Sequence, residues 1–111
     1  MKIEVRIARD FSKFPGGRYR KTGDFSGQEF REDVLHKHLR KGDTLKVILD
    51  GVDGYPPSFL EEAFGGLVRE GFPVHDILDK IEIAFESEEY LVYKEMVSEY
   101  LADAADELEK S

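Results

Sequence analysis

The chain has 111 residues, of which 41% are hydrophobic and 36% are charged. This length and composition suit a single domain, which we assign to residues 1–111. Cysteine is absent, which excludes disulfides, thiolate zinc sites and cysteine nucleophiles, and no apolar run reaches the roughly 18 residues that span a membrane. The formal net charge of −8 argues against a nucleic-acid partner, because affinity for the phosphate backbone depends on Lys and Arg.

The first element is predicted to be a strand, since Ile3, Val5 and Ile7 alternate with mostly charged residues. This alternation also differs from the uninterrupted apolar region of a signal peptide, so we expect a cytoplasmic protein. Residues 10–25 contain three glycines and a proline and are predicted to form a long loop, with a short return strand at residues 18–21.

A helix is predicted from Ser26 to about Lys41, because Ser26 and Glu29 have the spacing of a capping box. Gly42 is expected to end it. The buried face of this helix is predicted to consist of Phe30, Val34, Leu35, His38 and Leu39.

The loop before this helix suggests an anion site. Arg18, Arg20 and Lys21 precede Ser26 and Gly27, and exposed N–H groups at a helix start attract anions. One hypothesis is therefore an anion or nucleotide sensor. The simpler interpretation is a surface loop whose cations pair with the acidic part of the chain, since residues 1–41 carry 11 Lys/Arg against 6 Asp/Glu and residues 42–111 carry 5 against 18.

The most informative stretch is residues 45–68. Its apolar run, residues 45–49, is typical of a strand covered on both faces, and the strand ends at Asp50. Two glycines and two prolines then predict a turn. A second S-x-x-E pattern predicts that Ser58 starts the next helix, which makes its hydroxyl either a simple helix cap or a functional group.

Gly65 and Gly66 fall inside this second helix, where each glycine costs about 1 kcal/mol relative to alanine. They predict close packing of the helix against the sheet or a neighbouring backbone.

The remaining residues predict a connector over residues 71–80, a strand over residues 81–85 and a long amphipathic helix from Ser87 to about Leu108. Strands separated by helices indicate the α/β class. We expect a mixed sheet of about four strands with three main helices packed on it.

The sequence gives no sign of enzyme chemistry. His36 and His38 are two residues apart on a helix and point to different faces, and His75 has only Asp76 and Asp79 nearby, so we expect neither a metal nor another cofactor. P-loop and G-x-S-x-G patterns are absent. An acyl-transfer enzyme built on Ser58 with a distant base such as His75 is the least favoured hypothesis.

Residues 47–71, VILDGVDGYPPSFLEEAFGGLVREG, resemble the core of STAS domains, the fold of anti-sigma-factor antagonists. Residues 16–35, GGRYRKTGDFSGQEFREDVL, together with SFLEEAFGGL at residues 58–67, are similar to a prokaryotic STAS-like family of unknown function. In the antagonists a serine at this helix start is phosphorylated by an anti-sigma kinase, which breaks the complex. The resemblance makes Ser58 the counterpart of that serine and Asp50 the counterpart of the strand-end aspartate.

The resemblance implies a STAS-like regulatory module that binds a protein partner, such as a histidine-kinase-like ATPase, and has no catalytic activity of its own. We expect the partner to contact the turn and the start of the second helix. The predicted contact residues are Asp50, Asp53, Tyr55, Ser58, Phe59 and Glu62.

Overall fold

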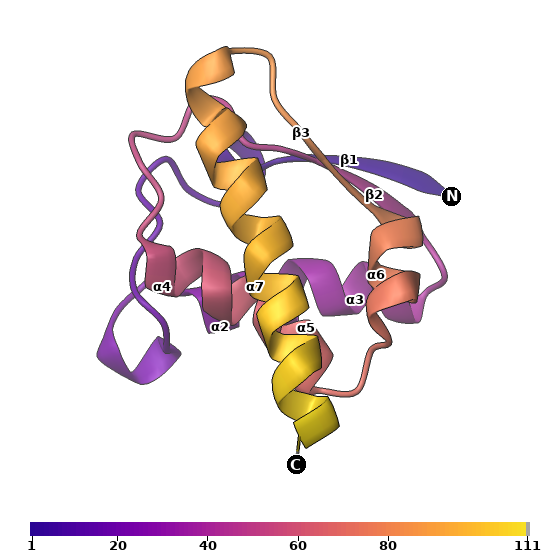
Figure 1. Cartoon of the computed structure of the whole chain (residues 1–111). Coiled ribbons are helices and arrows are strands. Elements are labelled where there is room, and N and C mark those ends of the chain that lie inside the picture. Colours follow the sequence, from indigo (N-terminus) through magenta and orange to yellow (C-terminus); the bar gives the residue numbers. More distant parts are fainter. Residues whose placement is uncertain (111) are drawn as a thin grey trace.

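A computed structural model describes residues 1–110 (Figure 1). Three parallel strands form one sheet in the order β1–β2–β3, and they span Lys2–Arg6, Thr44–Ile48 and Ile81–Ala84. In this register Val5, Val47 and Ile83 lie side by side. The α/β class is confirmed, but the sheet is parallel throughout the described residues rather than mixed.

The fourth strand expected at residues 18–21 is not found in the described part of the chain. Arg20–Thr22 instead form a short 3-10 helix, η1. The backbone N–H and the hydroxyl of Thr22 both donate to the Tyr19 carbonyl, at 3.1 and 2.9 Å, which closes this turn and leaves no extended segment.

The first long helix runs without a break through α2 (Gly27–Phe30), the π-helical segment η2 (Arg31–His36) and α3 (Lys37–Arg40). Its predicted start is confirmed, because the Ser26 hydroxyl accepts a hydrogen bond from the Glu29 N–H at 3.0 Å. Gly42 follows its end with a φ of 82°, the left-handed conformation that glycine adopts most easily.

The second long helix consists of α4 (Pro57–Leu60), the π-helical segment η3 (Glu61–Gly65) and α5 (Gly66–Arg69). The residue that caps it is Pro56 and not Ser58 as predicted, because Pro57 occupies the first helical position. The expected connector is also partly helical, since α6 spans Val74–Lys80 and buries Ile77.

The predicted C-terminal helix is confirmed as η4 (Glu88–Tyr90) followed by α7 (Leu91–Lys110). The first strand ends at Arg6, before Ile7, which was predicted to belong to it. Ile7 is fully buried but begins α1 (Ile7–Asp10), a single helical turn that leads into the long loop.

The molecule has two layers, with the helices on one face of the sheet. Ile3, Val5, Leu45, Val47 and Ile81 point into this interface. Figure 1 shows α7 crossing over α4 and α5, and it packs most closely on η3 between them. No helix within residues 1–110 combines the length and apolarity needed to cross a membrane.

The opposite face of the sheet carries polar side chains, so β2 is not covered by helices on both faces as its apolar run predicted. In the middle row of this open face, Lys46 lies between Glu4 and Glu82. The apolar residue Ile48 also lies on this side, next to Arg6 and Ala84, and is nonetheless buried.

Candidate functional site

Asp50 follows β2 at the carboxyl edge of the sheet, where open α/β folds commonly place their sites. Its two carboxylate oxygens accept hydrogen bonds from the backbone N–H groups of Glu86 and Ser87, each at 2.8 Å. These bonds fix the connection between β3 and the last helix. Asp50 therefore shapes the edge of the site, and its carboxylate oxygens are already engaged within the chain.

Three of the predicted contact residues are buried, which corrects their assignment to a docking surface. Phe59 is fully buried with its ring 5.9 Å from that of Phe30, and the Tyr55 hydroxyl donates to the Leu49 carbonyl at 2.7 Å. Burial raises the pKa of Tyr55. Glu62 is also buried. A docked partner cannot reach these side chains without opening the core.

Glu62 belongs to an ion-pair network between the two long helices. Its carboxylate accepts hydrogen bonds from Arg31 at 2.6 Å and from Arg18 at 3.1 Å, and Arg31 also donates to Glu70 at 2.9 Å. Only 8% of each side chain is exposed in the Arg31–Glu62 pair. Such a pair is held by its mutual hydrogen bonds, because loss of either side chain would leave the other buried with only its more exposed partners, Arg18 and Arg69 for Glu62 and Glu70 for Arg31.

Glu61 forms the outer part of the same network. It pairs with Arg69 at 2.7 Å and also with Arg18. The hydrogen bond from Arg69, followed by that from Arg18, lowers the pKa of the Glu61 carboxyl. The three arginines therefore have carboxylate partners within the domain.

Gly65 and Gly66 lie inside the second helix as predicted, but they face side chains rather than the sheet or a backbone. A Cβ atom on Gly66 would lie 2.3 Å from the nearer Nη of Arg31, and one on Gly65 would lie 2.5 Å from Glu61 Oε2. Gly66 thus provides the space in which the buried guanidinium of Arg31 is held. The close approach of backbones that we predicted occurs instead at Gly27, where a Cβ would lie 2.5 Å from the Phe59 carbonyl oxygen.

The basic loop does not present free donors at the helix start. Ser26 is fully buried, and the N–H groups of Gly27 and Gln28 donate to the carbonyls of Gly17 and Arg18 at 2.9 and 3.0 Å. Arg18 bonds to Glu61 and Glu62 as described. The sensor hypothesis therefore lacks the N–H groups on which it depends.

The other two cations of this loop are also engaged. Arg20 pairs with Glu32 at 2.9 Å and with Asp33 at 2.7 Å, and Lys21 lies 5.8 Å from the centre of the Tyr19 ring. The hydrogen bonds that Arg20 donates to Asp33 and Glu32 raise the pKa of its guanidinium. The simpler interpretation of the loop, in which its cations pair with carboxylates of the same protein, describes Arg18 and Arg20.

An open surface of mixed polar and apolar character lies beside the exposed turn that contains Asp53. Phe14 is 70% exposed there, and the hollow next to it has a volume of about 390 Å³. The Asp53 N–H donates to the Lys13 carbonyl at 3.2 Å, which ties the two loops together. We call this the Phe14 surface; its exposed or partly exposed residues are Phe14, Asp53, Gly54, Pro56 and Tyr93, and the buried residues Pro15 and Tyr55 complete the lining of the hollow.

The sequence interpretation missed Phe14 and Tyr93 as members of this surface. The signal for Phe14 was an aromatic residue next to a proline in a glycine-containing loop, where it has no helix or strand in which to be buried. Tyr93 had no such signal, because it belongs to the apolar stripe of the last helix. Its ring packs 5.1 Å from that of Tyr55, which brings the helix to the turn.

Ser58 is the second residue of α4 and is half-buried. Within residues 1–110 its hydroxyl makes no hydrogen bond. Glu61 and Glu62 follow at three and four residues, so they share its side of the helix. The hydroxyl of Ser58 thus has no capping role, in contrast to that of Ser26.

Each of the three histidines contacts a carboxylate, and among the described residues none of them forms a hydrogen bond with Ser58. His36 contacts Glu70 at 3.2 Å, His38 contacts Asp43 at 3.1 Å and His75 contacts Asp76 at 3.3 Å. In the part of the chain that the structure describes, no three His, Asp or Glu side chains are grouped closely enough to hold a metal ion.

The parallel sheet, the helices on one face and the turn at its carboxyl edge define a small two-layer α/β domain. A family model described as a STAS-like domain of unknown function (DUF4325) matches residues 26–91, more than half of the chain. The chain therefore belongs to this STAS-like family. No curated protein and no solved structure matches it.

Proposed function

We propose that this STAS-like protein is a non-enzymatic interaction module that binds a protein partner through the Phe14 surface. The observation that carries the proposal is the exposure of Phe14, since a large aromatic side chain with 70% of its surface in water beside a hollow of proline and tyrosine is typical of a protein contact. Asp53 is exposed at the same place and would give the contact a charged rim.

Ser58 is the proposed site of control by phosphorylation. A phosphoryl group would add about −1.5 to −2 charges. The first turn of the helix favours such a charge, but the carboxylates of Glu61 and Glu62 on the same helix side oppose it. Arg18, which now bonds to both, would be drawn towards the phosphate. Phosphorylation would therefore alter the anchor of the loop that carries Phe14.

The proposed partner is a protein such as a histidine-kinase-like ATPase, by resemblance to STAS antagonists. Its contact surface would have to accommodate the negative charge of Asp53. To test the binding, the proteins encoded next to this gene are purified and titrated against the domain by calorimetry. We expect one of them to bind, Phe14→Asp to weaken binding at least about tenfold, and Ser58→Glu to weaken it while Ser58→Ala does not.

Val92→Asp is the matched control, because Val92 is also an exposed apolar residue but lies outside the Phe14 surface. It should leave this affinity unchanged. Absence of binding by every candidate, or equal loss in Phe14→Asp and Val92→Asp, would refute the assignment of this surface. Equal affinities of the wild type, Ser58→Ala and Ser58→Glu would refute control at Ser58 alone.

A further inference from the structure

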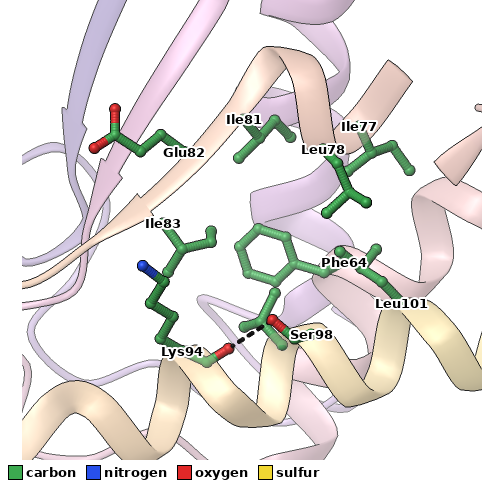
Figure 2. Close-up of a pocket in the computed structure, with 10 residues that line it drawn as sticks. Phe64, Ile77, Leu78, Ile81, Glu82, Ile83, Lys94, Ser98 and Leu101 are labelled. Carbon is green, nitrogen blue, oxygen red and sulfur yellow. Dashed lines mark hydrogen bonds between the residues drawn. The ribbon is translucent and has the colours of Figure 1, made fainter. Parts of the chain in front are cut away.

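A second hollow lies on another part of the molecule, between the outer edge of the sheet and the last helix. Its volume is about 260 Å³, and it shares no residue with the Phe14 surface. We call it the β3 pocket. Figure 2 shows its residues: Phe64, Ile77, Leu78, Ile81, Glu82, Ile83, Lys94, Val97, Ser98 and Leu101.

The β3 pocket is apolar inside and open at its rim. Phe64 is fully buried at its base, whereas Leu78 of α6 is 61% exposed. In Figure 2 the side chains of Ile81 and Ile83 point towards the hollow, while that of Glu82 points away from it. Glu82 nevertheless contributes to the lining, so the hollow reaches the edge of β3 itself.

The edge of β3 beside the pocket has backbone groups available for pairing. The Leu49 N–H donates to the Ala84 carbonyl at 3.0 Å, and alternate residues of a strand bond to the same neighbour. The N–H and C=O of Ile83 therefore face away from β2. Among the described residues no strand pairs with β3 on that side. An edge of this kind is a template for another strand.

Lys94 gives the pocket a positive charge at its mouth. Its Nζ lies 5.8 Å from the centre of the Phe85 ring, and within residues 1–110 no carboxylate comes within 4.0 Å of it. This contrasts with Arg18, Arg31 and Arg69, all of which have carboxylate partners. On the opposite side of the strand Glu82 is exposed, so the two sides of the edge carry opposite charges.

We propose that β3 and its pocket bind an extended segment of a partner protein by strand addition. An aliphatic side chain of the segment fills the pocket, and an acidic one two residues away pairs with Lys94. The residue between them faces the open side of the sheet, where a basic side chain pairs with Glu82. A second copy of β3 would have no free aliphatic side chain to offer, because Ile81 and Ile83 already pack within their own domain.

The test uses two acetylated, amidated peptides, Thr-Leu-Lys-Glu-Thr and the reverse Thr-Glu-Lys-Leu-Thr, because the segment can run in either direction. Each is titrated into the 15N-labelled protein while amide resonances are followed. We expect saturable shifts at the Ile83 and Phe85 amides and around the pocket, with a Kd below about 1 mM for one peptide.

N-methylation separates strand addition from simple insertion of leucine. One version of the binding peptide is methylated on the Leu and Glu nitrogens and another on the Lys nitrogen. Because alternate residues face the strand, only one version should lose binding. If both versions bind like the parent peptide, or if neither parent peptide gives saturable shifts up to about 1 mM, the proposal is wrong.

Protein variants locate the site. Ser98→Phe, at an exposed position of the lining, should fill the pocket and abolish binding, and Lys94→Glu should weaken it about tenfold. Val92→Asp, elsewhere on α7, and Phe14→Asp should leave it unchanged, which distinguishes this site from the proposed partner surface. Thermal melts establish that each variant is folded. A dimer in sedimentation that Ser98→Phe dissociates would instead assign the edge to a second copy and overturn the proposal.

Discussion

Gly65 and Gly66 are adjacent in the second helix, but their missing side chains face different neighbours. Gly66 lies against the buried side chain of Arg31, whereas Gly65 lies against the partly exposed ends of Glu61 and Arg69. We therefore expect Gly66→Leu to destabilise the protein by about 1 to 3 kcal/mol through overpacking, despite leucine's better helix propensity. Gly65→Leu should cost less, because Glu61 and Arg69 can move into solvent.

Urea denaturation of the two variants tests this difference. The free energies of unfolding can be compared directly if the m-values of the variants agree. Equal losses of unfolding free energy at the two positions would show that the contact between Gly66 and Arg31 does not limit the size of the side chain at position 66. Stabilisation by leucine at both would contradict the packing of this helix altogether.

Ser26 and Ser58 present a second contrast between residues of one type. The Ser26 hydroxyl is buried and caps its helix, so Ser26→Ala should cost about 0.5 to 2 kcal/mol. Ser58 caps nothing, and Ser58→Ala should change the free energy of unfolding by less than about 0.5 kcal/mol. Thermal melts of both variants measure the difference, and a larger loss for Ser58→Ala would restore it as the cap.

The two serines also show where a sequence pattern reaches its limit. Both have a glutamate three residues later, and from that spacing alone both are predicted caps. The difference is the Pro56–Pro57 pair. Proline suits the first helical position because its N–H is not needed there, so the helix begins at Pro57 and leaves Ser58 inside the first turn.

At the scale of elements, the two long helices are joined by the buried pair of Arg31 and Glu62. Removing one partner leaves the other charge buried, so Arg31→Met or Glu62→Leu alone should cost about 3 to 5 kcal/mol. The double variant should cost less than the sum of the two, because no unpaired charge remains at this contact. Urea denaturation of the four proteins of the cycle gives the coupling energy.

Arg20→Met is the matched control for this cycle. Arg20 also pairs with two carboxylates, Glu32 and Asp33, but 39% of its side chain is exposed. Its loss should therefore destabilise the protein far less than the loss of Arg31. Additive losses for Arg31→Met and Glu62→Leu would mean that the two side chains are not coupled in the folded protein.

The helices show which parts of an element the sequence can predict. The presence of both long helices followed from their apolar stripes, but their π-helical segments did not, because one widened turn leaves that pattern nearly unchanged. The sequence pattern predicts only a connector where the structure has the short helix α6. Its signal was present, since Val74, Ile77 and Leu78 have helical spacing after Pro73, but it is weak among four charged or histidine residues.

At the scale of the whole molecule, ion pairs connect the basic N-terminal part to the acidic remainder. Arg6 pairs with Glu86 at 2.9 Å, and Arg18 and Arg31 pair with carboxylates of the second helix. The positive charges concentrated in residues 1–41 thus pair with negative charges of residues 42–111 in the folded protein. For the candidate site, the sequence identified the turn near Asp53 and Ser58. It could not show that Tyr55, Phe59 and Glu62 face inward, because that depends on how the helices pack.

The open face of the sheet was the part of the architecture least accessible from the sequence. Parallel strands are usually covered on both faces, and the apolar run of β2 agrees with that rule. The exception is Lys46, the single charged residue in that run, whose side chain shares a row with Glu4 on one neighbour and Glu82 on the other. A charge in this position is the local sign of a face without helices.

This row gives a prediction for the sheet as a whole. Lys46→Glu would place three carboxylates side by side, and like charges on paired strands repel, so we expect a loss of about 0.5 to 2 kcal/mol. Lys46→Gln, the uncharged control, should lose less. Because the face is open to solvent, about 0.5 M salt should screen the repulsion and bring the two variants together in urea denaturation. If the gap between them persists at high salt, the charges are not solvent-exposed and another element covers this face.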